Sequence, residues 1–494
     1  MTGAPAPRAG HVLAIDQGTS ATKALVVADD GAVRARARVA VHPRAGAGGA
    51  VEQDPEALWR SVVRAGRSAL RRAGVAVEAV GLANQGETVL GWDRRSGRAL
   101  GPALSWQDRR ADVVCRRLRG EAATLTGITG LPLDSYFAAP KIAWLREQGA
   151  GSSVGAAAVV GTTDTWLLHR LTGTFATDAA TASRTLLLDL DRGEWSPDAC
   201  RIFRLDPQSL PAIQPCAGRF GSTTAFGPSL PVVAAIVDQQ AALFGAGCHA
   251  PGDAKCTLGT GAFLLVTVGA TAPRSSHGLG ASIAWQIGGT TTYCLDGGVA
   301  TAGAALDWLR RLGIGPPPGG LDRALRRAGA PEARPDFVPA LAGLAAPGWR
   351  PDARGAFLGL TLGTSRDDLA AAVVDGVAAQ VAELAAAAAA DTGRALSRVR
   401  VDGGLTRSPR VVQAVADRLQ APVEVYPGGD ATAMGVAALC RLGLGDPGGA
   451  ARIASGWRPA LTVAPAIGGA RAADLGGRWR QALRAVTARA DGER

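Results

Sequence analysis

The residues best suited to chemistry in this sequence lie in two polar turns, each of which follows an apolar run. In the first turn, Asp16 is followed by Gly18, Thr19, Ser20 and Lys23. Glycine lets backbone N–H groups approach an anion, and hydroxyl and ammonium groups add donors, so the turn is suited to phosphate. The acid that ends the strand could hold Mg²⁺, usually through water. An ordinary polar hairpin turn is the alternative.

The second turn contains Asp238, which follows the apolar run Val232–Val237. The run predicts a buried strand, and Gln239–Phe244 predict the first turns of a helix. In α/β folds, ligands bind at the ends of buried strands, so Asp238 is a candidate general base. Because Asp is also favoured at helix N-termini, a purely structural capping role is the alternative.

The pattern of strand, polar turn and strand occurs once in each half of the chain. Val12–Gly31 has it, and Cys256–Val268 repeats it without the acid, with Gly259, Thr260 and Gly261 in the turn. Two such hairpins, one early in each half, indicate two related domains that close on one phosphate chain. The sequence therefore predicts an α/β protein with its site between two domains.

Two long helices are predicted, one in each half of the chain. Val51–Arg72 is predicted as a helix with Pro55 near its first turn. Asp367–Thr392 is predicted as a long amphipathic helix that Asp367 caps and Gly393 ends.

The composition limits the classes of function. A chain of 494 residues is too long for one ordinary core, so at least two domains are expected. The net charge of +11 would suit a nucleic-acid binder, but the basic residues are scattered arginines with acids between them, so nucleic acid is not expected as a partner.

Targeting and cysteine signals favour the cytoplasm. The seven cysteines are scattered singly, which argues against disulfides and a zinc site and fits a reducing compartment. Residues 1–10 are expected to be a disordered leader. They lack the apolar core of a signal peptide, so no signal peptide is expected. The Ala-rich run Val381–Ala390 is interrupted by Glu383, so no membrane span is expected.

Eight short motifs give the sequence a resemblance to the FGGY carbohydrate kinases and, among them, to glycerol kinases. They recur in family order from about Val12 into the last hundred residues, and their order makes the resemblance specific. The motifs are DQGTS (Asp16–Ser20), NQGET (Asn84–Thr88), WQDRR (Trp106–Arg110), DTW (Asp164–Trp166), SRT (Ser183–Thr185), DQQAALFG (Asp238–Gly245), GTGAF (Gly259–Phe263) and VDGG (Val401–Gly404).

The resemblance implies the actin-like ATPase fold, which has two RNase H-like domains and an interdomain cleft. Residues 11–246 would bind substrate and phosphate, and residues 247–494 would bind the nucleotide. It further implies that the γ-phosphoryl group of ATP is transferred to a hydroxyl of a small polyol or sugar, with glycerol as the first candidate. Positioning and charge neutralisation supply most of the catalysis in such a transfer.

The resemblance also assigns roles to matching residues. Asp238 would be the base that takes the proton of the attacking hydroxyl, and Asp16 would hold Mg²⁺. The residues implied to clamp the phosphates are Thr19, Ser20, Lys23, Gly259, Thr260 and Gly261. Those implied to bind the rest of the nucleotide are Gly303, Asp307, Gly404 and Ser408. Those implied to bind the substrate are Gly86, Glu87, Trp106, Tyr136, Asp238, Gln239 and Phe263.

The main departure from the glycerol kinase pattern is Gly86, which stands where those enzymes carry an Arg that grips glycerol together with the next Glu. Our hypothesis is a substrate longer or differently hydroxylated than glycerol, or weak binding of glycerol. Milder departures are Lys23 for Arg, Ser408 for Asn and Asp307 for Gln. The loop Cys216–Pro231 lacks the Gly/Arg pattern of a sugar-phosphate regulatory site, so this regulation is expected to be absent.

Two alternatives remain open at this point. One is the same chemistry on a ketose such as a pentulose. The other is a non-catalytic, nucleotide-binding regulator of the actin-like superfamily, against which the retained Asp16 and Asp238 argue. FGGY kinases are often dimers or tetramers, and a homo-oligomer of either size is compatible with the sequence.

Overall fold

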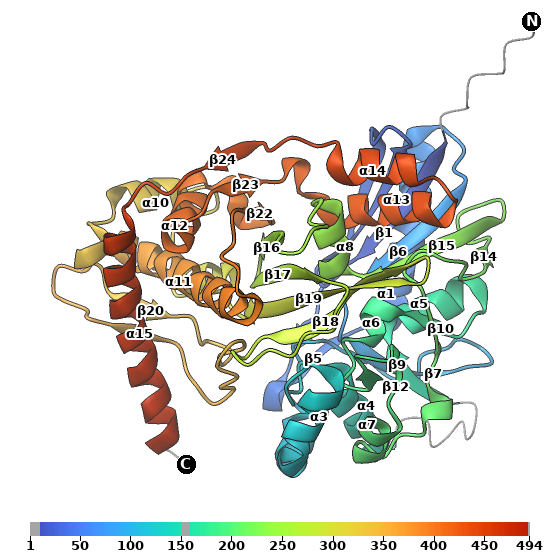
Figure 1. Ribbon diagram of the computed structural model, residues 1–494, viewed down its shortest axis with the longest axis horizontal. Coiled ribbons are helices and arrows are strands. Elements are labelled where there is room, and N and C mark those ends of the chain that lie inside the picture. The colour runs from blue at the N-terminus through green and yellow to red at the C-terminus, as the bar shows by residue number, and fades with distance from the viewer. Residues whose placement is uncertain (1–9, 150–157, 493–494) are drawn as a thin grey trace, which may run out of the picture.

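Two large β-sheets, one from each half of the chain, form the framework of the protein in the computed structural model (Figure 1). The structure describes residues 10–149 and 158–492, so nearly all of the predicted leader lies outside the described residues. Each sheet begins with a hairpin that the sequence predicts, and both predicted hairpins are confirmed.

The first sheet has six strands in the order β14-β15-β6-β1-β2-β3. The strands are β1 (His11–Gln17), β2 (Ala21–Ala28), β3 (Val33–Ala40), β6 (Ala79–Asn84), β14 (Ser222–Thr223) and β15 (Leu230–Val237). β1, β2 and β3 are antiparallel neighbours, whereas β6 runs parallel to β1 and β15 runs parallel to β6. Because β1, β6 and β15 are buried on both faces, their sequences are almost continuously apolar.

The second sheet repeats this topology in the order β18-β19-β17-β16-β22-β23-β24. The strands are β16 (Ala254–Leu258), β17 (Ala262–Gly269), β18 (Gly280–Ile287), β19 (Thr290–Val299), β22 (Val399–Asp402), β23 (Val423–Val425) and β24 (Leu461–Val463). The β16–β17 hairpin continues antiparallel into β19, while β22 and β23 run parallel on its other side. The two halves are therefore copies of one α/β unit.

A smaller sheet is attached to the first half and carries part of the site. Its order is β4-β5-β8-β7-β9; α4 packs on β7 and β9, α2 packs on α4, and α3 lies between α2 and α4 in the chain. These elements are β4 (Arg44–Ala45), β5 (Val51–Gln53), β7 (Val89–Asp93), β8 (Ala103–Leu104), β9 (Ala158–Thr162), α2 (Asp112–Arg117), α3 (Ala122–Thr129) and α4 (Ala138–Glu147).

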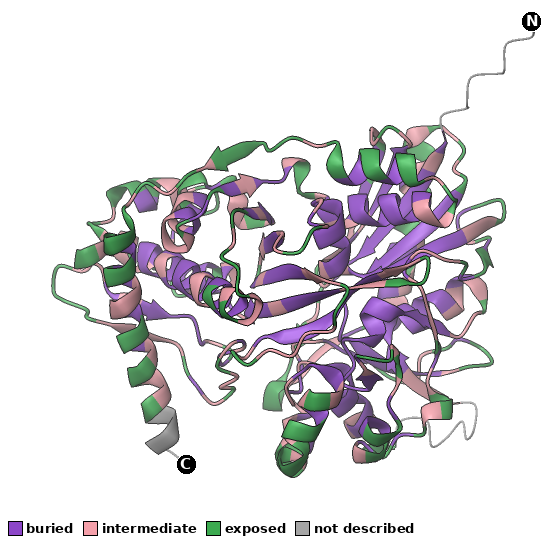
Figure 2. Cartoon of the chain, viewed as in Figure 1, coloured by how far each residue is buried: buried purple, intermediate pink, exposed green. Residues whose placement is uncertain are grey.

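Helices cover the large sheets and bury their apolar faces (Figure 2). Helix α1 (Pro55–Ala73) packs on β2 and β3, and α11 (Arg366–Thr392) packs on β17 and β19. Helix α13 (Ala431–Gly443) comes from the second half but lies against β1, β6 and β15 of the first sheet, and against α8 (Asp238–Gly245). A buried apolar cluster therefore joins the two halves, with members from β1, β15, α8, β17 and α13.

The remaining elements are short or peripheral. They are α5 (Thr163–Thr172), α6 (Ala179–Ala182), α7 (Pro197–Ile202), α9 (Gly303–Arg311), α10 (Leu321–Arg327), α12 (Pro409–Leu419), α14 (Pro447–Ser455), α15 (Gly469–Gly492), β10 (Ala176–Asp178), β11 (Leu188–Asp189), β12 (Glu194–Trp195), β13 (Ala212–Gln214), β20 (Asp336–Val338) and β21 (Ala356–Leu358).

Two predicted helix starts are wrong by a few residues. The segment Val51–Gln53 is strand β5, and the helix begins only at Pro55, because the Asp54 side chain accepts the N–H of Glu56 and fixes the first turn there. Helix α11 is capped by Ser365, not by Asp367, and Ser365 forms a reciprocal capping box with Asp368. Its predicted end at Gly393 is confirmed, since that residue adopts the left-handed conformation.

Helix α11 is long and apolar enough to cross a membrane by composition alone. However, 72% of its most apolar window is buried inside the fold. This burial is what a core helix of a folded domain requires, and it accounts for the Ala-rich sequence, because small side chains let the helix pack closely on the second sheet.

Candidate active site

Strand register brings the predicted site residues to one edge of the first sheet. Gln17 pairs with Asn84, and Asn84 pairs with Val237, so the carboxyl ends of β1, β6 and β15 are level. The chain segments that leave these three ends carry Gly18, Glu87 and Asp238. Residues far apart in sequence thus meet because parallel strands end together.

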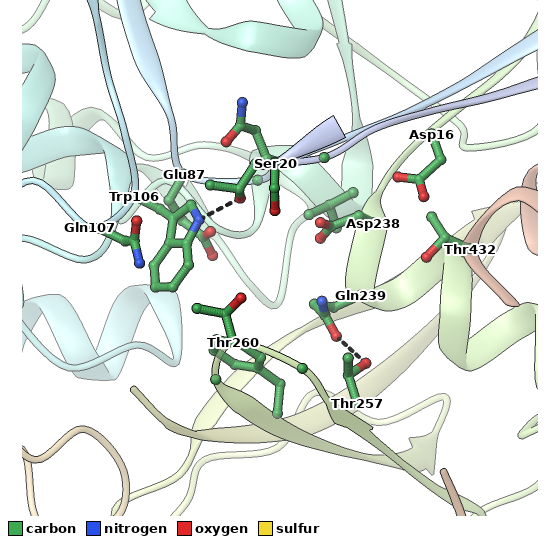
Figure 3. A pocket seen from close by; sticks show the side chains of 18 of the residues that line it. Asp16, Ser20, Glu87, Trp106, Gln107, Asp238, Gln239, Thr257, Thr260 and Thr432 are labelled. Carbon is green, nitrogen blue, oxygen red and sulfur yellow. Dashed lines mark hydrogen bonds between the residues drawn. The ribbon is translucent and has the colours of Figure 1, made fainter. Parts of the chain in front are cut away.

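A cavity of about 780 Å³ lies at this edge, between the two halves of the chain (Figure 3). All seven residues predicted to bind the substrate line it. Predicted metal and phosphate residues line it too, namely Asp16, Thr19, Ser20, Lys23, Gly259, Thr260 and Gly261, together with Asp307. In Figure 3, Thr257 and Thr260 of the second half lie across the cavity from Asp16, Ser20 and Asp238 of the first.

Three residues predicted to bind the nucleotide do not line this cavity. Gly303 donates its N–H to the carbonyl of Gly259 at 3.0 Å and supports the β16–β17 turn from behind. Gly404 follows β22 in a short 3-10 helix. The Ser408 hydroxyl caps α12 and bonds the carboxylate of Asp322 at 2.5 Å. Nucleotide contacts of these residues remain predictions.

Aromatic side chains form one wall of the cavity. Trp106 packs edge to face on Tyr136 and Phe263, with ring centroids 5.7 and 5.8 Å apart. The indole N–H of Trp106 donates to the Thr19 hydroxyl at 2.9 Å, which ties this wall to the β1–β2 turn. Burial, and next the Glu87 carboxylate, raise the pKa of Tyr136 well above its ordinary value. The phenol therefore stays protonated and can donate a hydrogen bond.

Asp238 is the first residue of α8, and the N-cap residue of this helix is Val237, so Asp238 does not stand at the capping position. Burial, followed by repulsion from Asp16 and Glu87, raises the pKa of Asp238 to about 8, while the charge of Lys255 opposes this rise. A carboxylate held among like charges in a buried site binds a proton more readily than a free one. Asp238 therefore has the proton affinity that a general base needs.

A buried polar chain holds Gln239, the neighbour of Asp238, in place. Lys255 forms an ion pair with Asp402 at 3.0 Å and also contacts the Thr257 hydroxyl. Thr257 in turn donates to Oε1 of Gln239 at 3.0 Å. The Lys255 side chain is 1% exposed, so this chain of polar contacts links β22, β16 and α8 from a buried ion pair to the half-buried Gln239 at the cavity.

The carboxylates in the cavity fit a divalent cation that is shared with phosphate. Asp16 is buried, and its carboxylate is 3.9 Å from the Lys23 ammonium, too far for a hydrogen bond. Burial raises the pKa of Asp16, and an oxygen donor that lacks close partners suits Mg²⁺. No group of three or more potential metal-ligating side chains occurs among residues 10–149 and 158–492. Such a cation would therefore depend on water or phosphate for most of its ligands.

Sequence reasoning missed Arg184 and Asp296, which both line the cavity. Arg184 donates to Glu87 at 2.8 Å and to Asp296 at 2.5 Å, so one buried guanidinium joins a substrate residue of the first half to β19 of the second. The SRT motif contained the only available signal, an Arg inside a segment that is otherwise buried and apolar. Its partner Asp296 could be identified only from the packing of the two halves.

The wall at Gly86 is formed by a side chain from the neighbouring strand. A Cβ atom placed on Gly86 would lie 2.6 Å from Cγ2 of Val237, which is inside the distance that real Cβ atoms keep. Val237 is the last residue of β15, directly before Asp238, and it lines the same cavity. Gly86 and Val237 are therefore sterically coupled, and this part of the wall is apolar.

Comparison with known proteins agrees with the geometry. The models of the FGGY family of carbohydrate kinases match residues 11–245 for the N-terminal domain and residues 254–443 for the C-terminal domain. A glycerol kinase of Methylobacterium nodulans is 42% identical over 492 residues, covering 96% of this chain and 97% of that protein.

Solved structures share the fold over nearly the whole chain. The glycerol kinase of Plasmodium falciparum with ADP superposes with a TM-score of 0.86 at 28% identity, covering 97% of this chain and 98% of the other. A xylulose kinase of Rhodospirillum rubrum reaches 0.82 at 26% identity, with coverages of 96% and 98%. The predicted fold of two RNase H-like domains is confirmed, and the chain belongs to the FGGY family of carbohydrate kinases.

Proposed function

We propose that this protein transfers the γ-phosphoryl group of ATP to a hydroxyl of glycerol, giving glycerol 3-phosphate. The observation that carries the proposal is the position of Asp238. Its half-buried carboxylate lies between an aromatic wall and two opposed turns rich in N–H and hydroxyl donors. The relatives named glycerol kinase, about 40% identical over nearly their full length, support the same substrate.

The residues of the chain supply most of what the reaction needs. Glu87 and Asp238 accept hydrogen bonds from the polyol, and Asp238 takes the proton of the attacking hydroxyl. Tyr136 donates to the polyol and Trp106 covers its carbon skeleton. The turns at Thr19 and Thr260 hold the phosphates, and Mg²⁺ on Asp16 would neutralise charge on them when bound.

The apolar wall at Gly86 and Val237 favours a second candidate, a ketose such as a pentulose. A wall without donors gives one glycerol hydroxyl no partner, whereas a larger substrate could place carbon there and satisfy its hydroxyls elsewhere. The likeness to a xylulose kinase, at 26% identity, is compatible with this alternative. The chemistry at Asp238 would be unchanged.

The deciding experiment measures ADP release by the purified protein with ATP and Mg²⁺. Glycerol, erythritol, the pentitols and the common ketopentoses are compared, with Asp238→Asn as the control. Turnover of glycerol that is lost in the control supports the proposal. Turnover of a larger compound alone replaces glycerol with that compound, and no turnover of any compound, with ATP still bound, favours a non-catalytic regulator.

A further inference from the structure

A second cavity, of about 680 Å³, lies where α2 of the first half faces the segment between β20 and β21 of the second. None of the residues that line it lines the active-site cavity. Five arginines and three aspartates form its charged lining, so its formal charge is +2, from five minus three. The two halves each contribute to this lining, and the cavity therefore depends on their arrangement.

The acids of this second cavity are already paired. Arg109 forms ion pairs with Asp112 at 3.0 Å and with Asp134 at 2.6 Å. Arg350 pairs with Asp352 at 3.0 Å. Two arginines thus pair with all three aspartates, which leaves one negative charge, and the other three arginines bring the formal charge of the lining to +2.

Those three arginines are Arg116, Arg119 and Arg354, and all are exposed. Arg354 is held in place because it donates to the carbonyls of Pro351 and Ala353 at 3.0 and 2.9 Å. Among the described residues none of the three has a carboxylate partner. Cations that converge from two domains repel one another, and an anion between them would remove that repulsion.

We propose that this second cavity binds a small organic anion with two or more negative charges, of the phosphate ester class. Guanidinium groups match phosphate oxygens by their forked donors, and three of them are free to turn toward one ligand. Leu133 and the Trp349 indole supply an apolar surface for the carbon part of the ligand. The indole is fixed by its hydrogen bond to the carbonyl of Gly278 at 2.7 Å.

The anion site is connected to the active site through aromatic contacts. Trp349 packs on Phe137, with centroids 6.0 Å apart, and Phe137 packs on Tyr136 at 5.1 Å. Both cavities also require the same arrangement of the two halves. An anion that bridges Arg119 and Arg354 stabilises this arrangement, and linkage then requires tighter binding of the polyol. This coupling rests on the proposed function, whereas the binding itself does not.

The probe is 2-phosphoglycolate, which carries a phosphate and a carboxylate and has no hydroxyl to phosphorylate. Calorimetric titration into the full chain, saturated with ADP to fill the active site, should give one site per chain. Arg116→Ser with Arg119→Ser should weaken binding about tenfold or more, and Arg354→Ser should do so from the other half. The matched control, Arg326→Ser with Arg327→Ser on exposed α10, removes the same charge and should leave binding unchanged.

Three results would overturn the proposal. They are no binding to the ADP-saturated protein, equal weakening in the control variant, and full binding in both the Arg116/Arg119 and the Arg354 variants. For the coupling, 2-phosphoglycolate should lower the KM for the polyol severalfold with little change in kcat. An unchanged KM with intact binding would reject only the coupling, and absence of turnover on every polyol would leave the binding result standing.

Discussion

The pKa of Asp238 depends on charges that the fold places near it. Asp16 and Glu87 approach from β1 and from the segment after β6, and both disfavour a second negative charge in a buried site. The positive charge of Lys255 opposes this effect on Asp238. Lys255 also belongs to the chain of polar contacts that reaches Gln239. Four elements therefore set the proton affinity of Asp238, and substitutions in any of them should change it.

Replacing the base tests its role directly. Asp238→Asn keeps the size of the side chain and removes the proton acceptor, so kcat should fall by about 10²- to 10⁴-fold. Binding of ADP, measured by calorimetry, should change little, because the phosphate turns are intact. A variant that retains more than about a tenth of the wild-type kcat would exclude Asp238 as the general base.

Because Gly86 is in steric contact with Val237, a substitution at Gly86 alone does not isolate its effect on substrate specificity. Gly86→Arg alone should disturb the β15–α8 junction, because its Cβ would clash with Val237. Activity on every substrate should therefore fall. Combining it with Val237→Gly makes room for the guanidinium and should raise kcat/KM for glycerol relative to larger polyols by about tenfold or more.

The control for this pair is Val237→Gly alone, which opens the wall without adding a donor. It should broaden the substrate range without favouring glycerol. If the double variant shows the same substrate preference as Val237→Gly, the residue at position 86 does not set specificity.

At the residue scale, the sequence identified most of the cavity lining, because short turns after apolar runs carry their polar residues with them. The partners of Arg184, among them Asp296, and the contact of Gly86 with Val237 were not predictable, since each depends on side chains from separate elements. Gly303 and Ser408 were expected at the nucleotide, but in the structure they form hydrogen bonds with Gly259 and Asp322.

At the scale of elements, the position of α8 depends on its crossing with α13. A Cβ on Gly435 would fall well inside contact distance of the Ala241 carbonyl, and one on Gly245 would meet the Ala431 carbonyl. The two helices thus touch backbone to backbone. Because Asp238 is the first residue of α8, this crossing also places the base.

Gly435→Ala should therefore push the helices apart and lower both stability and activity. We expect the free energy of unfolding to fall by about 1–3 kcal/mol and kcat to fall with it. Gly477→Ala on α15 is the matched control, since no atom of the described residues lies within 4 Å of its added Cβ. The control should be neutral or stabilised by up to about 1 kcal/mol in urea titrations. Equal effects of the two changes would show that the crossing tolerates the methyl group.

Asp178, which caps α6 with a hydrogen bond to Thr181, predicts how stability depends on pH. Burial, and next the nearby Asp164, raise the pKa of Asp178 to about 7. The folded protein then holds a proton that the unfolded chain releases above its ordinary pKa. Stability should therefore fall as pH rises from about 4 to about 7, by up to about 1.4 kcal/mol per pH unit.

Asp178→Asn removes this proton and keeps an oxygen for the Thr181 N–H. The difference in unfolding free energy between the variant and the wild type should grow with pH across this window. Urea titrations at pH 5, 6 and 7 measure it. A difference that is constant over the three pH values would contradict a raised pKa at Asp178.

The order and type of the long elements could be predicted, because hydrophobic periodicity is local. The start of α1 at Pro55 and the N-cap of α11 at Ser365 were misplaced, since several nearby acids or hydroxyls can cap and only the folded turn selects one. The doubled hairpin was predictable for the same local reason. Its placement across a cleft from its copy follows from tertiary packing.

At the scale of the whole molecule, Arg184 is a direct link between the two halves inside the cleft. Arg184→Lys keeps the charge but loses the fork that reaches Glu87 and Asp296 together. The KM for the polyol should rise about tenfold, with a smaller change in the KM for ATP. Steady-state kinetics on both substrates measure this, and Arg192→Lys, at an exposed pair, is the control. An equal change in both KM values would indicate general damage.

The return of α13 to the first sheet has a consequence for biosynthesis. Strands β1, β6 and β15 leave the ribosome long before residues 431–443, yet these residues form part of their cover. The face of the first sheet that α13 covers should therefore stay exposed until translation is almost complete. A chain that stops before α13 should be captured by chaperones or aggregate, although it contains the whole first sheet.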